Sequence, residues 1–201
     1  QAVVGKGGKG CHVPVSLSGD ELVYHFRSPV HRGDLWVCGL AEACAGGDGS
    51  GPAVKAKQLT QTMPRKLQRK LCLPEEVVIK NRDSGGSFHA LLFRPLPAPS
   101  ETGAAPVAAS LLYKPLVWVH GGPTTHYSYD YNPFLNWLAS LGCLVCAPNF
   151  RGSSGFGIDF MDAPMKGGCG TVDVSDCKAC ARYLRWLRDR RRGGDAAINL
   201  D

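Results

Sequence analysis

Two glycine-rich turns hold most of the residues in this chain that could do chemistry. The first has the sequence HGGP at 120–123 and follows the apolar segment 115–119, and the second has the sequence NFRGSSGFG at 149–157 and follows the apolar segment 144–148. Glycine lets the backbone approach a bound molecule closely. Uncovered N–H groups in such turns can stabilise a carbonyl oxygen as it gains negative charge. The two turns therefore indicate one wall of a hydrolytic site.

The chain offers no serine with the surroundings of an activated nucleophile. Such a serine stands in the pattern G-x-S-x-G, on a strained turn between a strand and a helix. Ser153 and Ser154 lie in the stretch GSSGF at 152–156, which lacks this spacing, and no other serine of the chain meets it. We therefore predict that neither serine is a nucleophile.

The nine cysteines are odd in number and scattered along the chain. This is a poor disulfide framework and favours a reducing compartment, so we predict a cytoplasmic location. Two pairs, Cys143/Cys146 and Cys177/Cys180, have the spacing of zinc ligands. The first pair falls in a predicted strand, where an offset of three residues sends side chains to opposite faces, and the second lies on the apolar side of a predicted helix. We assign all four to the core and expect neither a metal nor a cysteine nucleophile.

The formal net charge of +6 comes largely from two basic clusters, at 65–70 and 182–192. Neither has the groove-reading motif of a nucleic-acid-binding surface. In the second cluster, charged residues recur at helical spacing opposite apolar ones; the charged set is Lys178, Arg182, Arg185, Asp189 and Arg192, and the apolar set is Val174, Cys177, Ala181, Leu184 and Leu187. We interpret this pattern as the solvated face of an amphipathic helix and expect no nucleic-acid partner.

The overall composition is that of a soluble globular protein, with 44% hydrophobic and 20% charged residues. No apolar run approaches the roughly 18–20 residues that a membrane-spanning helix needs. We therefore expect no membrane partner.

The first region, residues 1–62, predicts short β-strands. The pattern over 13–28 predicts a turn and an alternating strand, 34–40 predicts another strand, and 58–60 predicts an edge element. The glycine-rich stretch 45–52 predicts a loop. One such set of strands cannot bury both of its faces, so we expect it to be part of a larger array, as a propeller blade is.

Residues 63–74 are polar and basic, as in a linker or surface helix, and residues 75–201 predict an α/β fold. The predicted strands are 76–80, 87–93, 116–119 and 144–147, and the predicted helices are 132–141 and 173–192. A turn at 83–86 makes the first two strands a hairpin. We expect the last two strands to be fully buried, in a parallel sheet that helices cover on both sides.

Local signals mark the ends of the last helix. Asp173 can cap it, and Asp176 falls in its first turn, where the helix dipole favours an anion. Gly193 and Gly194 supply a stop at the other end. The Pro- and Ala-rich stretch 95–109 predicts a flexible surface insertion.

These stretches resemble the prolyl oligopeptidase family of serine peptidases, and within it the acylaminoacyl-peptidase and dipeptidyl-peptidase-like members. The resemblance rests on 74–77 with the hairpin to 93, on 115–123, 138–142 and 148–157, and on the helix with Asp173 and Asp176. Upstream, 18–20, 34–37 and 58–60 look like the last blade of the family's β-propeller. The resemblance implies the end of a propeller at 1–62, a linker at 63–74 and the N-terminal half of an α/β-hydrolase domain at 75–201.

The family activity that the resemblance implies is hydrolysis of short peptides through an acyl-enzyme, carried out by a Ser-Asp-His triad without a cofactor. It makes the Gly122 amide the candidate for one oxyanion-hole donor. His120 precedes any possible nucleophile, whereas the base histidine of this fold follows it, so we predict a structural role for His120. His126 could line the site or lie in a surface loop. Arg151 could bind a substrate carboxylate or carbonyl, or anchor its own turn, and we favour the structural role.

The resemblance places the nucleophile on the strand after the helix that ends near Arg192, and 198–201 looks like the approach to that strand. We therefore expect a fragment without the triad, inactive on its own. Two alternatives stay open. One is an esterase of the α/β-hydrolase type, against which the upstream blade argues. The other is a non-catalytic interaction protein that truly ends at residue 201, which would leave a costly unpaired strand edge.

Overall fold

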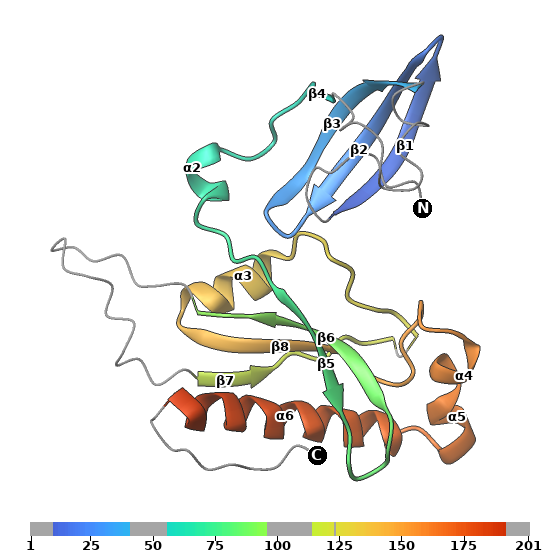
Figure 1. Ribbon diagram of the computed structural model, residues 1–201, viewed down its shortest axis with the longest axis vertical. Coiled ribbons are helices and arrows are strands. Elements are labelled where there is room, and N and C mark those ends of the chain that lie inside the picture. The colour runs from blue at the N-terminus through green and yellow to red at the C-terminus, as the bar shows by residue number, and fades with distance from the viewer. Residues whose placement is uncertain (1–9, 41–55, 96–113, 123, 192–201) are drawn as a thin grey trace, which may run out of the picture. The chain divides into compact units, whose positions relative to one another are not determined.

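The structure, a computed structural model, describes residues 10–40, 56–95, 114–122 and 124–191. They belong to two compact units: unit 1 comprises Gln1–Leu73 and Tyr129–Asn132, and unit 2 comprises Pro74–Ser128 and Pro133–Asp201. Figure 1 shows the strands of unit 1 in blue and the sheet and helices of unit 2 in green to red.

Unit 1 is built on an antiparallel sheet whose strands follow one another in chain order. The strands are β1 (Cys11–Ser18), β2 (Glu21–Ser28), β3 (His31–Gly39) and β4 (Lys57–Gln58), in the order β1-β2-β3-β4. A short helix, α2 (Arg65–Gln68), follows. This consecutive order is what a propeller blade has. The assignment of residues 1–62 to a propeller stays a prediction.

A small aromatic core and one buried carboxylate stabilise this sheet. Tyr24, Phe26 and Cys38 form the buried cluster, because alternate residues of β2 face the same side. The buried Asp34 accepts hydrogen bonds from the Thr60 hydroxyl at 3.1 Å and the Thr62 amide at 2.7 Å. These bonds attach the segment after β4 to β3.

Unit 2 is built on a mixed sheet. Its strands are β5 (Glu75–Lys80), β6 (Ser87–Phe93), β7 (Lys114–Val117) and β8 (Cys143–Asn149), in the order β5-β6-β8-β7. The β5–β6 hairpin is confirmed, and β6 and β8 are also antiparallel. Only β7 and β8 run parallel among the described strands. The helices are α3 (Pro133–Ser140), α4 (Ile158–Met161), α5 (Ala163–Gly167) and α6 (Val172–Arg191).

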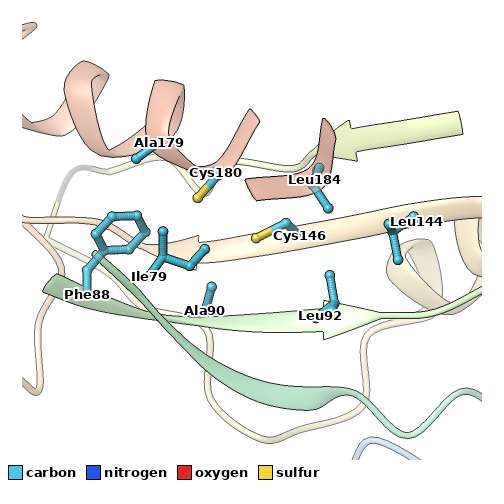
Figure 2. Close-up of a cluster of buried hydrophobic side chains, with 9 residues drawn as sticks. All are labelled: Ile79, Phe88, Ala90, Leu92, Leu144, Cys146, Ala179, Cys180 and Leu184. Atoms are coloured by element: carbon cyan, nitrogen blue, oxygen red, sulfur yellow. The ribbon is translucent and has the colours of Figure 1, made fainter. Parts of the chain in front are cut away.

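Helices cover both faces of this sheet, as the sequence predicted; Figure 1 shows α6 on one side and α3 on the other. The α6 side forms a cluster of buried residues, drawn in Figure 2: Ile79, Phe88, Ala90, Leu92, Leu144, Cys146, Ala179, Cys180 and Leu184. Val145 and Ala147 alternate with the β8 members of that cluster and therefore point to the opposite face. Leu135 and Ala139 of α3 are fully buried there.

One expectation about the sheet is partly confirmed and another is wrong. β7 and β8 pair in parallel as predicted, but the sheet as a whole is mixed, because β6 pairs antiparallel with both β5 and β8. The segment 116–119 is not fully buried: Trp118 is 39% and Val119 47% exposed. The reason is that β7 lies at the end of the described sheet and has a neighbouring strand on one side only.

The predicted apolar face of α6 is only partly right. Leu184 is buried and Leu187 packs against the core, but Val174 is 42% exposed. The buried face begins instead at Asp176 and continues through Ala179 and Cys180. Asp173 does not cap the helix either, because its carboxylate accepts the Gly170 amide, which precedes the helix. The predicted charged face, from Lys178 to Asp189, is exposed, which confirms that part of the pattern.

The cysteines of the two C-x-x-C pairs divide into buried and half-buried ones. Cys146 and Cys180 are fully buried in the core, while Cys143 and Cys177 are half-buried. Burial raises the pKa of the Cys177 thiol to about 11. A hydrogen bond with Cys146, together with burial, raises the pKa of Cys180. Neither thiol therefore has the lowered pKa of a reactive cysteine.

Among the described residues, no cluster of three or more His, Cys, Asp or Glu side chains is arranged to bind a metal ion. No helix in the described ranges is long and apolar enough to cross a bilayer. Several predicted features lie outside the described residues: the loop at 45–52, the insertion at 95–109 apart from Pro95, the helix stop at 193–194 and the segment 198–201.

We predict that Leu184→Ala lowers the free energy of unfolding by about 2–5 kcal/mol, because it opens a cavity between α6 and the sheet. The matched control is Leu141→Ala, whose side chain is 56% exposed. It should cost about 0.5 kcal/mol or less. Urea unfolding followed by far-ultraviolet circular dichroism measures both. Equal effects of the two substitutions would contradict the packing of α6 on the sheet.

Candidate functional site

The two glycine-rich turns lie at the same edge of the unit 2 sheet. HGGP follows β7, and NFRGSSGFG begins at the last residue of β8, which runs parallel to β7. The pairing continues one residue beyond β7, where the Trp118 amide donates to the Cys146 carbonyl at 2.9 Å. Ligands of α/β proteins bind beyond the carboxyl ends of parallel strands, so this edge is the place to look for a site.

The structure brings the two turns into direct contact. The Ser154 amide donates to the Thr124 and Thr125 carbonyls, at 3.2 and 3.3 Å. The imidazole of His126, through Nδ1, lies 2.9 Å from the Ser154 hydroxyl oxygen. His126 is exposed. The second turn is thus hydrogen-bonded to the segment that follows HGGP, and His126 takes part in this contact.

His120 occupies the interior of this contact. Its ring stacks on Phe150 at 4.5 Å between centroids and meets the ring of Tyr127 edge-on at 5.3 Å. Burial lowers the pKa of His120 below its ordinary value of 6.5, so the ring is neutral at pH 7. Burial also raises the pKa of Tyr127 to about 12.

Ser153 and His120 form a hydrogen-bonded pair that is not a catalytic one. The distance from His120 Nε2 to Ser153 Oγ is 2.9 Å, within the range of a nucleophile and its base. However, the Ser153 hydroxyl donates to the Phe150 carbonyl at 2.7 Å, and the residue has no exposed surface. Its proton is therefore used inside the turn and no substrate reaches it. This geometry supports the structural role predicted for His120.

Gly122 has a positive φ angle, a backbone conformation that favours glycine. Its φ is +92°, and a Cβ at this position would lie 3.2 Å from Cγ2 of Thr125. The residue is exposed, and its N–H makes no hydrogen bond within the described part of the chain. An uncommitted amide of this kind can donate to a bound oxygen. The assignment of Gly122 to an oxyanion hole stays a prediction.

Arg151 is tied to the interior of unit 2. Its Nε and Nη2 donate to the two carboxylate oxygens of Asp176, at 3.0 and 2.7 Å. Its Nη1 and Nη2 also bond the carbonyl and hydroxyl oxygens of Ser84. The hydrogen bond to Asp176 is the main cause that raises the pKa of Arg151. With its guanidinium occupied in this way, Arg151 anchors its own turn, which supports the structural reading over substrate binding.

Asp176 is the centre of this network, and sequence reasoning missed that role. Its carboxylate is fully buried and accepts the Arg151 guanidinium, the Arg151 amide at 2.9 Å and the Asn81 side-chain amide at 2.7 Å. Asn81 in turn accepts the Asp83 amide at 3.0 Å. The network joins the β5–β6 turn, the second glycine-rich turn and the start of α6. A carboxylate on the same helical face as Ala179, Cys180 and Leu184 was the available signal.

Two further residues shape the turns without having been predicted to do so. Asn149 and Tyr127 bond reciprocally: the Tyr127 amide donates to the Asn149 side chain at 2.7 Å, and that side chain donates to the Tyr127 carbonyl at 3.0 Å. Gly152 has φ +115°, and a Cβ there would lie 2.9 Å from the ring of Pro164. Only glycine fits this position without displacing α5.

Comparison with known proteins gives a consistent result. Residues 128–190 match the sequence model of the Prolyl oligopeptidase family. A dipeptidyl aminopeptidase BIII from Pseudoxanthomonas mexicana is 49% identical over 59 residues, which is 29% of this chain and 8% of the relative. Acylamino-acid-releasing enzyme 2 from Oryza sativa subsp. japonica is 36% identical over 73 residues, which is 36% of this chain and 9% of the relative. The matched segments thus span less than a tenth of these relatives' length.

Solved structures resemble the chain over most of its length. The acylaminoacyl peptidase of Pyrococcus horikoshii matches 90% of this chain and 26% of its own, with a TM-score of 0.65 at 21% identity. A puromycin hydrolase matches 85% of this chain and 23% of its own, with a TM-score of 0.64 at 24% identity. At this level of identity, the likeness establishes the fold.

The sheet order, the crossover through α3 and the two glycine-rich turns at the carboxyl ends of β7 and β8 define an α/β fold with a candidate site at one edge of its sheet. The sequence match makes the identification more specific. The match over residues 128–190 and the matches to curated peptidases support the predicted resemblance to the prolyl oligopeptidase family of serine peptidases.

We predict that Asp176→Asn lowers the free energy of unfolding by about 3–5 kcal/mol, because it leaves the Arg151 guanidinium without its buried counter-charge. The matched control is Asp159→Asn: Asp159 also pairs with a cation, Lys166, but its side chain is 98% exposed. The control should leave the unfolding midpoint in urea unchanged. A similar midpoint for both variants would contradict the central role of Asp176.

We predict that the His120 ring titrates with a midpoint below pH 6.5. Because burial lowers its pKa in the folded chain, the unfolded chain binds the proton more readily. The contribution of the neutral ring to stability is complete above pH 6.5 and falls as the pH drops below 6.5 towards the folded-state pKa. Proton NMR of the ring, assigned with His120→Asn, gives the midpoint. A value at or above 6.5 would show that the ring is not buried as described.

Proposed function

We propose that this chain forms part of a serine-type peptidase that hydrolyses short peptides through an acyl-enzyme. The observation that carries the proposal is the contact between the two glycine-rich turns at the carboxyl ends of β7 and β8. The Gly122 amide at this sheet edge, which makes no hydrogen bond within the described residues, supports an oxyanion hole there like the one that α/β hydrolases assemble. The family that residues 128–190 match suggests the reaction class.

The described residues correspond to one half of such a site. The Gly122 N–H would stabilise the oxyanion, and the second donor would be the amide after a nucleophilic serine. That serine would attack the peptide carbonyl while a histidine takes its proton, and the proton would leave with the amine. Water would then release the acyl group. The mechanism needs no cofactor.

The exposed flank of β7 supports a neighbouring strand that carries the nucleophile. Trp118 and Val119 expose apolar surface there, and β7 has no partner on that side among the described residues. An uncovered edge strand with apolar side chains is costly in water. A further strand after α6, carrying the serine elbow, would cover it.

The proposed domain organisation is the end of a propeller at 1–62, a linker at 63–74 and the N-terminal part of a hydrolase domain at 75–201. The consecutive antiparallel order of β1 to β4 supports the first assignment. Val13, Val15 and Leu17 of β1 are each 40% exposed or more, as apolar surface that awaits a further layer would be.

A peptide substrate is supported by the names of the relatives. These include a dipeptidyl aminopeptidase and acylamino-acid-releasing enzymes, and one acylaminoacyl peptidase was solved in complex with Z-Gly-Gly-Phe-chloromethyl ketone. We further propose a cytoplasmic location, because every described cysteine is a free thiol. Nucleic-acid and membrane partners are not part of the proposal.

We predict that the purified 201-residue chain is not labelled by a fluorophosphonate probe. The chain contains no G-x-S-x-G, and Ser153 is buried with its proton already donated. Labelling is read by gel fluorescence and mass spectrometry, with an active serine peptidase as the positive control. Covalent labelling at any serine of the chain would contradict the prediction.

The proposed function itself is tested by following the reading frame beyond residue 201. We expect a G-x-S-x-G within the next few tens of residues, then an aspartate and a histidine. The product of that longer frame should hydrolyse acyl-alanyl or dipeptidyl p-nitroanilides and lose this activity on fluorophosphonate treatment. A stop codon directly after Asp201, or a longer product without hydrolysis, would overturn the proposal.

A further inference from the structure

A groove of about 530 Å³ lies between β5 and α6, within unit 2. The residues that matter for its chemistry are Val78, Lys80, Arg82, Tyr183, Arg185 and Trp186, and we call it the β5–α6 groove. Its volume is within the range of about 300–1,000 Å³ that ligand sites have. Neither of the glycine-rich turns contributes to it.

One wall of the groove is a single face of α6. Ala179, Arg182, Tyr183 and Trp186 all line it, and their spacing of three, four and seven residues places them on one side of the helix. The rings of Tyr183 and Trp186 stack at 5.8 Å between centroids. The wall is therefore aromatic, and the Arg190 guanidinium lies over the Trp186 ring, 4.8 Å from its centroid.

The other wall is the open edge of β5. The groove is lined by three consecutive residues, Val78, Ile79 and Lys80. Successive side chains of a strand point to opposite faces, so a groove that touches all three runs along the strand's edge. β5 stands at the end of the described sheet and has no partner on this side in that part of the chain.

The hydrogen-bond pattern shows which backbone groups face the groove. The Asn81 amide donates to the Gly86 carbonyl at 3.0 Å, which makes this pair a hydrogen-bonded one. Hydrogen-bonded and non-hydrogen-bonded pairs alternate along an antiparallel ladder. Ile79, two residues before Asn81, is therefore hydrogen-bonded to β6, whereas the backbone N–H and C=O groups of Val78 and Lys80 face outward. The outer edge of β5 thus presents backbone N–H donors and C=O acceptors at the spacing with which a neighbouring strand would pair.

The charge of the groove is unbalanced. Arg182 pairs with Asp83 at 2.9 Å, and Asp189 pairs with Arg188 at 2.9 Å. Lys80, Arg82 and Arg185 have no ion-pair partner within the described residues, and all three are exposed. Three uncompensated cations therefore surround the aromatic wall and the open edge.

We propose that the β5–α6 groove binds an extended acidic peptide segment, which adds a strand to the edge of β5. Its backbone would pair with Val78 and Lys80, as in other strand-addition complexes. Its carboxylates would face Lys80, Arg82 and Arg185, and an apolar side chain would rest on Tyr183 and Trp186. A peptide is favoured over a small organic anion because only a peptide uses the outward backbone groups. This proposal does not depend on the peptidase activity.

The test uses the whole 201-residue chain and fluorescence anisotropy with labelled hexapeptides. The probe is Glu-Val-Glu-Phe-Glu-Val. The first control replaces each Glu with Lys, and the second keeps the sequence but carries N-methyl groups on alternate amides, in each of the two registers. We expect the probe to bind. The Lys peptide and at least one of the two N-methylated peptides should bind at least tenfold more weakly.

Two variants locate the site. Arg82→Glu with Arg185→Glu should weaken binding of the probe at least tenfold, whereas Lys66→Glu with Lys70→Glu, an equal charge change at exposed cations outside the groove, should leave it within twofold. Val78→Pro removes an outward amide and should also weaken binding tenfold. Proline is tolerated where the N–H of an edge strand faces away from its neighbour, so circular dichroism should remain unchanged.

Three outcomes would overturn the proposal. The first is failure of the probe to bind. The second is equal binding of the probe and both methylated peptides, which would show that the groove binds the peptide by charge and not by backbone pairing. The third is displacement of the probe by dodecanoate at comparable affinity, which would assign the groove to small amphipathic anions. The peptide comparisons need no variant, so they decide the matter even if Val78→Pro fails to fold.

Discussion

The fully buried carboxylate of Asp176 is the constraint on which the rest of unit 2 depends. A charge removed from water must be paired and hydrogen-bonded, or its burial costs several kcal/mol. Asp176 meets this requirement by accepting bonds from Arg151 and Asn81, and these two residues come from different turns. The chain can therefore bury the α6 face of the sheet only when the β5–β6 turn and the second glycine-rich turn both adopt their observed conformations.

The conformation of the site follows from this network. Once Arg151 is anchored, Phe150 and Ser153 are placed so that the neutral ring of His120 stacks on one and bonds the other. The reciprocal bonds of Asn149 with Tyr127 then fix the return of the chain towards α3. The polar residues that look most reactive in the sequence are thus engaged in shaping the turns. Among the described residues, the turns leave the backbone amide of Gly122 without a hydrogen bond, and a free N–H is the group that an oxyanion hole requires.

The two outer strands of the unit 2 sheet give it two different edges. The segment that directly follows β7 exposes Trp118 and Val119, and the β5 edge borders a groove with an aromatic wall and with cations that have no ion-pair partner among the described residues. Apolar surface on β7 fits a further strand of the same sheet, whereas the charge along β5 fits a soluble acidic segment. Each edge of one sheet therefore has a surface chemistry that matches a different neighbour.

Local sequence patterns alone determined the β5–β6 hairpin, the helix α3, the buried strand β8 and the family resemblance of residues 128–190. They could do so because each depends on residues that are close together in the sequence, such as the Asp83-Ser84-Gly85-Gly86 turn or the glycine-rich motifs. Only the tertiary structure decided that the sheet is mixed, that β7 lies at its edge, and that α6 buries Asp176 while exposing Val174. The physical reason is that strand order and helix rotation depend on partners far apart in the chain: the bond between Asn81 and Asp176 joins residues 95 positions apart, and no local pattern encodes it.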